Sequence, residues 1–247
     1  MEIAVVGAGG RVGREVTDIL KNQGHEIVEV TRSAGVDVHT GTGLAEALSG
    51  VEAVIDAVNI PPSPDTDVVT GFFRTTARNL QRAAAAAGVR RIVLVSIIGI
   101  DEFTSGHYAG KLAQERALLE GPVPVRIVRA AQFHEFPAMM LEWTTQGDVA
   151  RVPAMRTQLV AVRTVAEKLA EIAVHDGPAM TDIAGPEEIR LSVAAAEVAR
   201  RRGYPARVEE VADTSDPNHG LQATGALLPG PDAVIAGPTF AEWLTRR

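Results

Sequence analysis

The stretch VVGAGGRVG, residues 5–13, places four glycines among nine positions near the start of the chain. Glycine weakens regular structure, so a cluster of it indicates a backbone arrangement that side chains would obstruct. The apolar run EIAVV, residues 2–6, precedes the cluster and predicts a strand, while an amphipathic segment from residue 12 to residue 23 predicts a helix. A glycine cluster between a strand and a helix is typical of a dinucleotide-binding loop, and a plain glycine turn is the simpler alternative.

The spacing G-x-x-G-x-x-G predicts a separate task for each of three glycines. Gly7 would permit the tight turn, Gly10 would let the backbone approach a pyrophosphate, and Gly13 would let the helix pack closely on the strand. The N–H groups and partial positive charge at the start of the helix would then bind phosphate. The candidate cofactor-binding residues of this loop are Gly7, Gly9, Gly10, Arg11, Val12 and Gly13.

The end of the second predicted strand indicates which dinucleotide binds. Proteins that bind NAD usually carry an acidic residue about 20 residues after the glycines, where it holds the ribose 2′-hydroxyl. Here the strand ends in Thr31, Arg32 and Ser33, with no acid among them. A guanidinium pairs well with a 2′-phosphate and the two hydroxyls can add hydrogen bonds, so NADP(H) is favoured over NAD(H). Glu29, three residues before Arg32, keeps NAD(H) as an alternative.

Apolar runs rich in β-branched residues alternate with segments of helical composition. The predicted strands are Ile3–Val6, Ile27–Val30, Val51–Ala57, Arg91–Ser96 and Val125–Arg129. The predicted helices are Val12–Gln23, Leu44–Leu48, Val68–Ala87 and Lys111–Glu120. Such alternation predicts an α/β fold, with a doubly wound parallel sheet covered by helices on both faces. We expect a single domain over residues 1–247, in which residues 1–130, approximately, bind the cofactor and residues 131–247 contribute the substrate cleft.

The regular alternation of predicted strands and helices becomes less clear after residue 130. Thr164 and Glu167 fit a capping box that opens a helix to Val174, and Thr239 and Glu242 fit a second one. Ser192 is predicted to cap a helix over Val193–Arg202, and Asp213–Pro231 is predicted to be a long loop. Pro61–Asp67 is interpreted either as a lid over the nicotinamide or as a loop stiffened by its prolines.

Composition narrows the class of protein. The chain has 247 residues, of which 46% are hydrophobic, and a net charge of −7 without a long basic run, which argues against a nucleic-acid partner. There is no cysteine, and the six histidines lack metal-ligand spacing, so no metal is expected. No apolar run approaches the roughly 18 residues that a membrane span needs. Met1 leads directly into the first strand without a signal peptide, so we expect a cytoplasmic protein that uses no membrane.

Beyond these patterns, the sequence resembles the NmrA-like branch of the atypical short-chain dehydrogenases/reductases. The matching stretches are GAGGRVG, EVTRS, Gly35–Asp37, VIDAVN, RIVLVS followed by IIGID, YAGKLAQE and RAAQFHEF, and the resemblance covers approximately residues 1–190. It implies a Rossmann fold that binds NADP(H), with the substrate cleft built by the C-terminal part. It also implies that Asp37 lies near the adenine, that Asp56, Ala57 and Val58 run beneath the cofactor, and that Ala130 to Phe133 border the nicotinamide.

Short-chain reductases use a Ser, a Tyr and a Lys, with the Tyr four residues before the Lys. The resemblance therefore implies Ser96 and Lys111 as catalytic residues, and Lys111 also as a cofactor contact. Here Tyr108 lies only three residues before Lys111, and His107 occupies the fourth position. Both positions neighbour the lysine on a helix but differ by about 100° in direction. Three alternatives therefore stay open: Tyr108 is the proton donor, His107 is the proton donor, or neither residue is.

The stretch after the fifth predicted strand supplies the candidate substrate contacts, Phe133 and His134. The favoured function is an NADP(H)-dependent oxidoreductase acting on a small carbonyl, alcohol or activated double bond. The alternative is a non-catalytic NADP(H)-binding redox sensor that acts through a protein partner, and a weaker option is nucleotide-sugar or isoprenoid-type chemistry. The substrate is a small molecule of unknown identity, and both a monomer and a homodimer remain open.

Overall fold

A computed structural model describes residues 1–61, 63 and 65–246. The chain forms two compact units. The first unit holds residues 1–96, 106–129 and 162–181, and the second holds residues 97–105, 130–161 and 182–247. The chain passes into the second unit at residue 130, and residues 162–181 return to the first. The expected division between a cofactor-binding part and a substrate-cleft part stays a prediction. The lid interpretation of residues 61–67 includes residues 62 and 64, which lie outside the described residues.

Seven strands within the described residues form one sheet in the order β12-β9-β5-β4-β3-β1-β2. Their bounds are β1 Glu2–Val6, β2 Glu26–Val30, β3 Ala53–Asp56, β4 Arg91–Ile97, β5 Val125–Ala130, β9 Met180–Ala184 and β12 Val234–Ile235. The pairs β1–β2, β1–β3, β3–β4 and β9–β12 are parallel. The order reverses at β1, which is the switch point where doubly wound sheets bind ligands at their carboxyl ends. The predicted α/β fold with a Rossmann-type sheet is confirmed.

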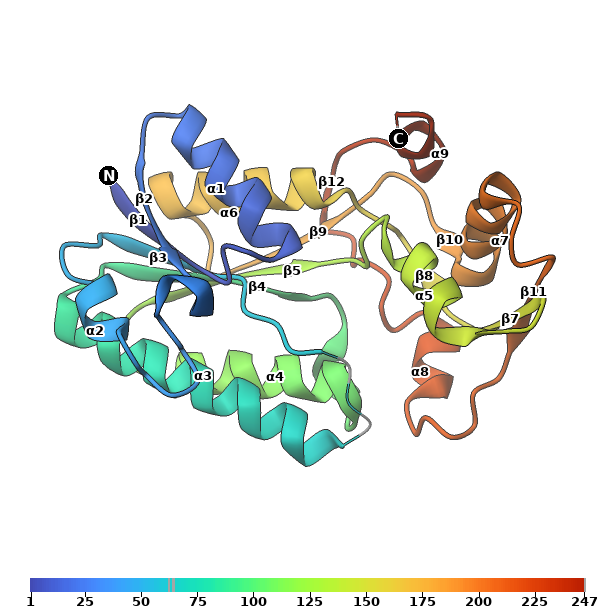
Figure 1. Cartoon of the computed structure of the whole chain (residues 1–247), viewed down its shortest axis with the longest axis horizontal. Helices are drawn as coiled ribbons and strands as arrows, with labels where there is room; N and C mark the ends of the chain where they lie inside the picture. The colour runs from blue at the N-terminus through green and yellow to red at the C-terminus, as the bar shows by residue number, and fades with distance from the viewer. Residues whose placement is uncertain (62, 64, 247) are drawn as a thin grey trace. The chain divides into compact units, whose positions relative to one another are not determined.

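Helices cover both faces of the sheet in the first unit. Figure 1 shows α1 (Arg11–Asn22) and α6 (Val162–His175) on one face, and α2 (Leu44–Ala47), α3 (Thr66–Ala87) and α4 (Gly106–Leu119) on the other. The short 3₁₀ helix η1 spans Arg32–Ala34. Fully buried Leu80, Ile92 and Leu118 belong to the core between α3, α4 and the sheet. This core depends on the β-branched strands and on the alanine-rich end of α3, which permits close packing.

The sequence located most elements of the first unit to within two residues. Asp65 caps α3 by accepting hydrogen bonds from the N–H groups of Asp67 and Val68, so the helix begins at Thr66 rather than at the predicted Val68. The larger error concerns α4, which begins at Gly106 instead of Lys111. Gly106 and Gly110 hid its first turn, because glycine disfavours helices. His107 and Tyr108 therefore lie on the same helix as Lys111.

The second unit contains further elements, of which the sequence predicted only the helix that ends at Arg202 and the helix that Thr239 opens. They are η2 (Ile100–Glu102), α5 (Phe136–Thr144), β6 (Thr145–Gln146), β7 (Val149–Pro153), β8 (Arg156–Thr157), β10 (Ile189–Arg190), α7 (Leu191–Arg202), β11 (Arg207–Val211), α8 (His219–Thr224) and α9 (Phe240–Thr245). Within its described residues, β11, β7 and β6 form one small sheet, and β10 and β8 form another. Strands of two residues carry no detectable alternation of apolar and polar side chains, which is why the sequence did not predict them.

Of the predictions for the chain after residue 130, three are wrong and one is confirmed. Thr164 does not start a helix, because α6 begins at Val162 and Glu167 instead pairs with Arg163 one turn away. Ser192 is not a cap either: α7 begins at Leu191, and the Ser192 hydroxyl donates to Glu210 (2.6 Å). The predicted loop from residue 213 to residue 231 contains α8. The capping box that opens α9 is confirmed, since Thr239 and Glu242 bond each other's backbone N–H groups.

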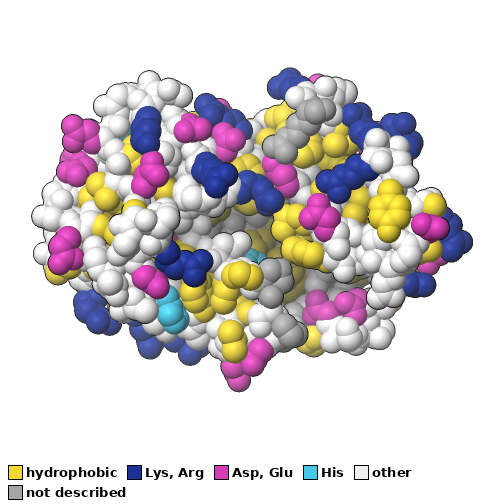
Figure 2. Space-filling view, in the orientation of Figure 1, with side chains coloured by type: hydrophobic (Ala, Val, Ile, Leu, Met, Phe, Trp, Pro, Cys, Tyr) yellow, Lys and Arg dark blue, Asp and Glu magenta, His cyan; other side chains and the backbone are white. Residues whose placement is uncertain are grey.

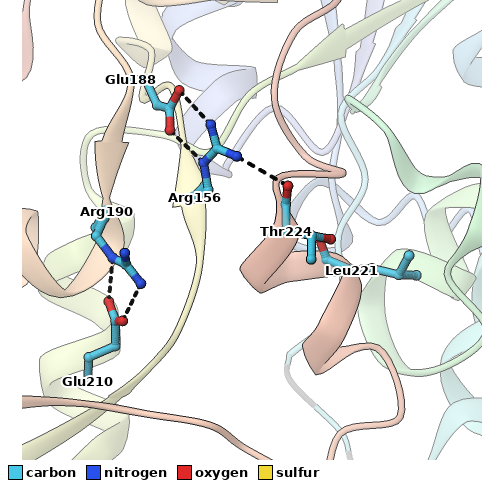
Figure 3. Close-up of polar contacts among 6 residues, drawn as sticks. All are labelled: Arg156, Glu188, Arg190, Glu210, Leu221 and Thr224. Carbon is cyan, nitrogen blue, oxygen red and sulfur yellow. Dashed lines mark hydrogen bonds and ion pairs between the residues drawn. The ribbon is translucent and has the colours of Figure 1, made fainter.

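Arginine–glutamate pairs line the small sheet of β8 and β10. Arg156 and Arg190 stand opposite each other in its antiparallel register. Figure 3 shows that Glu188 binds the Arg156 guanidinium through two hydrogen bonds, and that Glu210 does the same for Arg190. Arg156 also donates to the carbonyl oxygen of Thr224 at the end of α8 (3.3 Å). The pairs compensate two like charges across the strands, but exposed ion pairs add only about 0–1 kcal/mol each.

The described residues include no helix long and apolar enough to cross a membrane. On the face shown in Figure 2, Lys and Arg side chains alternate with Asp and Glu side chains rather than gathering by sign. The cytoplasmic location, the absence of nucleic-acid partners and the choice between monomer and homodimer stay predictions.

Candidate functional site

The glycine loop lies at the carboxyl ends of β1 and β3. Gly7 has a φ of +78°, which favours glycine, and its N–H donates to the carbonyl oxygen of Val30 (3.0 Å). A Cβ on Gly7 would stand 2.7 Å from the carbonyl oxygen of Ala57. The tight turn predicted for Gly7 therefore has two causes, the positive φ and the close approach of the chain after β3.

The start of α1 is built to leave its N–H groups accessible to an anion. Gly10 is the N-cap, and no side chain caps the helix there. Gly13 lies against the turn itself, since a Cβ on it would meet the Gly7 carbonyl oxygen at 2.2 Å. Gly9 is different, because the nearest atom to its Cβ position is Thr31 Cγ2 at 3.9 Å. A helix start without a side-chain cap, over a turn with three glycines, fits a pyrophosphate, so the residues present fit the predicted dinucleotide.

The end of β2 carries the side chains that would distinguish the two cofactors. Thr31 caps η1 by accepting from the N–H of Ala34 (3.2 Å), and its hydroxyl lies 3.0 Å from that of Ser33. Arg32 is exposed, and no described residue forms a hydrogen bond or ion pair with its side chain. Glu29 is engaged elsewhere, in an ion pair with Lys21 of α1 (2.7 Å). Glu29, the acid that kept NAD(H) as an alternative, therefore points toward α1.

Asp37 stabilises its own loop. Its carboxylate accepts a hydrogen bond from the N–H of His39 (2.8 Å), and its backbone pairs with Thr42 in an isolated bridge. The structure gives Asp37 a part in shaping the loop after β2, and a contact with adenine stays a prediction.

Asp56 ends β3 as a buried carboxylate. One carboxylate oxygen accepts from the N–H of Val58 (3.1 Å), and the other accepts from the side-chain amide of Gln114 on α4 (2.9 Å). Burial raises the pKa of Asp56, while Lys111 and these two hydrogen bonds act in the opposite direction. Val58 and Ala57 are half-buried beside it. The predicted floor of the cofactor site therefore contains a charge whose partners lie inside the protein.

Lys111 is buried on α4, the helix that also carries Gln114. Its ammonium donates to the side-chain oxygen of Gln114 and lies 5.0 Å from the centre of the Phe73 ring. Burial lowers the pKa of Lys111 to about 8, and the charges of Asp56 and Glu115 limit the fall. The lysine is thus mostly protonated at neutral pH and readily loses its proton in mildly alkaline solution.

The structure separates the two candidates for the proton donor. His107 packs against Phe73, with ring centres 5.6 Å apart, and burial together with the nearby Lys111 lowers its pKa to about 4. An imidazole with that pKa is neutral at pH 7, so His107 does not fit the donor role, although it occupies the expected position four residues before Lys111. Tyr108 is half-buried in the first turn of α4 and is the better candidate.

His107 should make the stability of the protein depend on pH. The unfolded chain protonates this imidazole below its ordinary pKa of 6.5, whereas the folded chain resists protonation down to about 4. Stability due to His107 is therefore complete above pH 6.5 and is lost as the pH falls toward 4. We expect His107→Phe to remove about 2 kcal/mol of the loss in unfolding free energy between pH 7 and pH 5, measured by urea denaturation. The control is His39→Gln, at an exposed histidine, and an unchanged pH dependence in His107→Phe would contradict the burial of the imidazole.

Ser96 is the remaining catalytic candidate in the first unit. It lies near the carboxyl end of β4 and is 3% exposed, and its hydroxyl has no hydrogen-bond partner within the described part of the chain. A buried hydroxyl without a partner loses free energy, so it marks a position where a ligand oxygen would be favourable.

The remaining candidates lie in the second unit. Ala130 ends β5 and is buried, and half-buried Phe133 forms a parallel bridge with Val160. His134 is fully buried: its Nε2 donates to the carbonyl oxygen of Leu159 (3.1 Å), and its ring packs edge-on against Trp243 of α9. These are the contacts of a core residue. A substrate contact for His134 stays a prediction without structural support.

Sequence reasoning missed the side chains that surround Lys111. Gln114 and Glu115 follow it by three and four residues, the spacing that puts side chains on one helix face. Arg129, a buried charge in strand β5, binds Glu115 through two hydrogen bonds of 3.0 and 2.7 Å. A charged residue within a buried strand is a usable signal, because it requires a buried partner. No group of three or more metal-ligating side chains occurs among the described residues.

A family model described as NAD(P)H-binding matches residues 7–176, which include the glycine loop, Asp56 and Lys111. The chain belongs to this NAD(P)H-binding family. The resemblance to the NmrA-like branch fits that membership. The cofactor is thus confirmed as a nicotinamide dinucleotide, without a choice between NAD(H) and NADP(H).

Members and structural neighbours of this kind include several reductases. The chain is 29% identical over 228 residues to (4-alkanoyl-5-oxo-2,5-dihydrofuran-3-yl)methyl phosphate reductase of Streptomyces griseus, with 85% of this chain and 77% of the relative covered. Its fold matches the NADPH-dependent quinone oxidoreductase QOR2 of Escherichia coli in complex with NADPH, with a TM-score of 0.73, 19% identity and 99% of each chain covered. It also matches MoeE5 in complex with UDP-glucose and NAD, with a TM-score of 0.69, 18% identity and coverage of 100% of this chain and 99% of the other. The last two likenesses concern the fold alone.

Proposed function

We propose that this protein is an NADPH-dependent reductase that reduces a carbon–carbon double bond conjugated to a carbonyl in a small molecule. The observation that carries the proposal is the uncapped start of α1 next to the end of β2, where the exposed Arg32 has no partner among the described residues. The names of two similar proteins support the acceptor class, since a quinone and an alkanoyl-oxo-dihydrofuran both contain such a double bond.

Different residues of the chain would bind different parts of the cofactor. Backbone N–H groups in the first turn of α1 would bind the pyrophosphate, because no side chain caps the helix and the helix start favours negative charge. Arg32, assisted by the hydroxyls of Thr31 and Ser33, would bind the 2′-phosphate. Lys111 would contact the nicotinamide ribose, as the family resemblance implies.

When bound, the cofactor supplies a hydride, so the protein must supply one proton to complete a two-electron reduction. Tyr108 would donate that proton from its hydroxyl. The Lys111 ammonium would stabilise the resulting phenolate. The hydroxyl of Ser96, which lacks a partner among the described residues, would donate a hydrogen bond to the acceptor oxygen as charge develops on it.

Binding of NADPH and NADH tests the cofactor assignment. We expect Arg32→Ala to weaken NADPH binding by about 1.5–3 kcal/mol, tenfold or more, while NADH binding barely changes, because one charge-assisted contact is lost. Fluorescence titration measures both affinities. Arg82→Ala removes the same charge from an exposed position on α3 and should leave both nucleotides unaffected. Equal losses for NADPH and NADH in Arg32→Ala would contradict a 2′-phosphate contact.

The reductase assignment is tested by oxidation of NADPH in the presence of a quinone or an unsaturated lactone. Turnover that depends on the acceptor supports it. The displaced Tyr108 and the neutral His107 favour a second candidate, an NADP(H)-binding sensor that acts through a protein partner. Tight NADPH binding without turnover of any conjugated acceptor would select the sensor.

A further inference from the structure

Gln114 connects two buried charges that come from different elements. On one side, its amide oxygen accepts a hydrogen bond from the ammonium of Lys111, one turn earlier on α4. On the other side, its amide nitrogen donates to the carboxylate of Asp56 at the end of β3 (2.9 Å). Gln114 itself is completely buried. The two partners fix the orientation of the amide, because the reverse orientation would place donor against donor and acceptor against acceptor.

The surroundings of Lys111 leave few other groups to stabilise its charge. From α3 it meets the face of the Phe73 ring, and from α4 it meets His107, whose low pKa keeps it neutral near pH 7. Glu115 on α4 also acts on it, but its carboxylate is already bound by Arg129. Asp56 is therefore the acid whose charge is not committed to an arginine, and Gln114 is the hydrogen-bonded link to it.

A buried ammonium loses several kcal/mol of hydration, and only good hydrogen-bond geometry and a nearby carboxylate offset this loss. The link through Gln114 supplies both, since a chain of hydrogen bonds polarises along its length in a medium of low dielectric constant. Without the amide, Lys111 would lose its acceptor and Asp56 would lose a donor at the same time. Each would then favour its neutral form.

We propose that Gln114 is a positioning residue that links the Lys111 ammonium to the Asp56 carboxylate through its amide and so keeps Lys111 protonated and fixed at the cofactor site. This role rests on the proposed function, in which Lys111 contacts the nicotinamide ribose and assists Tyr108. The competing explanation is that Gln114 only stabilises the fold, as Gln81 does: Gln81 is also buried, and its amide bonds the backbone of Leu118 and Val123.

The lysine content of the chain allows a direct test. Lys21, Lys111 and Lys168 are the lysines of the sequence, and the structure places Lys21 and Lys168 in surface ion pairs. Protein labelled with ¹³C-lysine therefore gives a small set of side-chain resonances, whose titration reports the pKa of Lys111 without cofactor or turnover. Gln114→Met keeps the shape of the side chain and removes both hydrogen bonds. We expect it to lower the pKa of Lys111 by about one unit, a tenfold change in proton affinity.

Two further variants make the test specific. Gln114→Glu keeps an acceptor for the ammonium and should restore or raise the pKa of Lys111. Asp56→Asn removes the distant charge and replaces one of its two acceptor oxygens with a donor. It should therefore also lower the pKa of Lys111, and it remains informative if Gln114→Met folds poorly. The matched control, Gln81→Met, should lower stability and leave the Lys111 titration unchanged.

The pH profile of NADPH binding supplies the functional readout. Wild-type affinity should weaken as the pH rises through about 8, where Lys111 deprotonates. In Gln114→Met the weakening should begin about one pH unit lower. An unchanged lysine titration in both Gln114→Met and Asp56→Asn would overturn the positioning role. If the lysine titration shifts but NADPH binding does not depend on pH, the link from Lys111 through Gln114 to Asp56 is upheld. Its role at the cofactor site is then rejected. Acceptors that are never reduced would reject the proposed function and leave the titration result intact.

Discussion

Replacing Glu115 by leucine is expected to lower the free energy of unfolding by about 3–5 kcal/mol, because the change removes a buried carboxylate that accepts two hydrogen bonds from a buried arginine. Glu115 on α4 is 2% exposed and Arg129 on β5 is 8% exposed. Two hydrogen bonds, of 3.0 and 2.7 Å, join the guanidinium to the carboxylate. Water cannot replace a partner at this depth, so the loss should far exceed that of an exposed ion pair.

The double variant Glu115→Leu/Arg129→Met separates the energy of the pair from the cost of removing only one of its two partners. Replacing both partners with apolar side chains of similar size is often close to neutral, so we expect it to recover most of the stability lost in Glu115→Leu. Urea denaturation of the wild type, both single variants and the double variant measures the coupling. Arg78→Met/Glu120→Leu, at an exposed pair, is the control and should change stability by less than about 1 kcal/mol. A similarly small loss in Glu115→Leu would show that the pair is hydrated in solution.

The parts of the site predicted from the sequence are those that depend on the backbone. The loop around Gly7 and Gly13 and the guanidinium at Arg32 follow from short-range patterns, because a turn and a strand end need only their own residues. The surroundings of Lys111 depend instead on which helix face meets which strand. Asp56 and Gln114 are 58 positions apart in the chain, and nothing local to either indicates the other.

Predictions were limited where local signals competed with tertiary contacts. Ser192 has the chemistry of a helix cap, but its hydroxyl binds Glu210, and α7 starts one residue earlier. His134 follows a strand end, where ligands usually bind, and the aromatic residues of α9 bury it completely, so its substrate contact stays a prediction. In both cases the deciding partner lies far away in the sequence, so that periodicity and capping patterns carried no information about it.

Gly13→Ala should abolish useful cofactor binding and destabilise the first unit, whereas Gly9→Ala should do neither. A Cβ on Gly13 would stand 2.2 Å from the Gly7 carbonyl oxygen and 2.7 Å from Ala8 Cα. Both are backbone atoms, so relief requires α1 to move away from the turn, and the cost should reach the upper part of the 1–3 kcal/mol that overpacking causes, about 3 kcal/mol. The same movement displaces the N–H groups that would bind the pyrophosphate.

The Gly9 control isolates this effect, because its Cβ position meets only a methyl group of Thr31 at 3.9 Å, an ordinary contact. Both variants insert the same methyl group into the same loop, so a difference between them reports geometry rather than chemistry. Thermal unfolding and NADPH titration measure the two consequences separately. If Gly13→Ala binds NADPH within threefold, about 0.7 kcal/mol, of the wild type, the packing of α1 against the turn does not set the phosphate site. If Gly9→Ala fails as well, a bound phosphate must approach Gly9 itself, and the site extends further along the loop than the helix start.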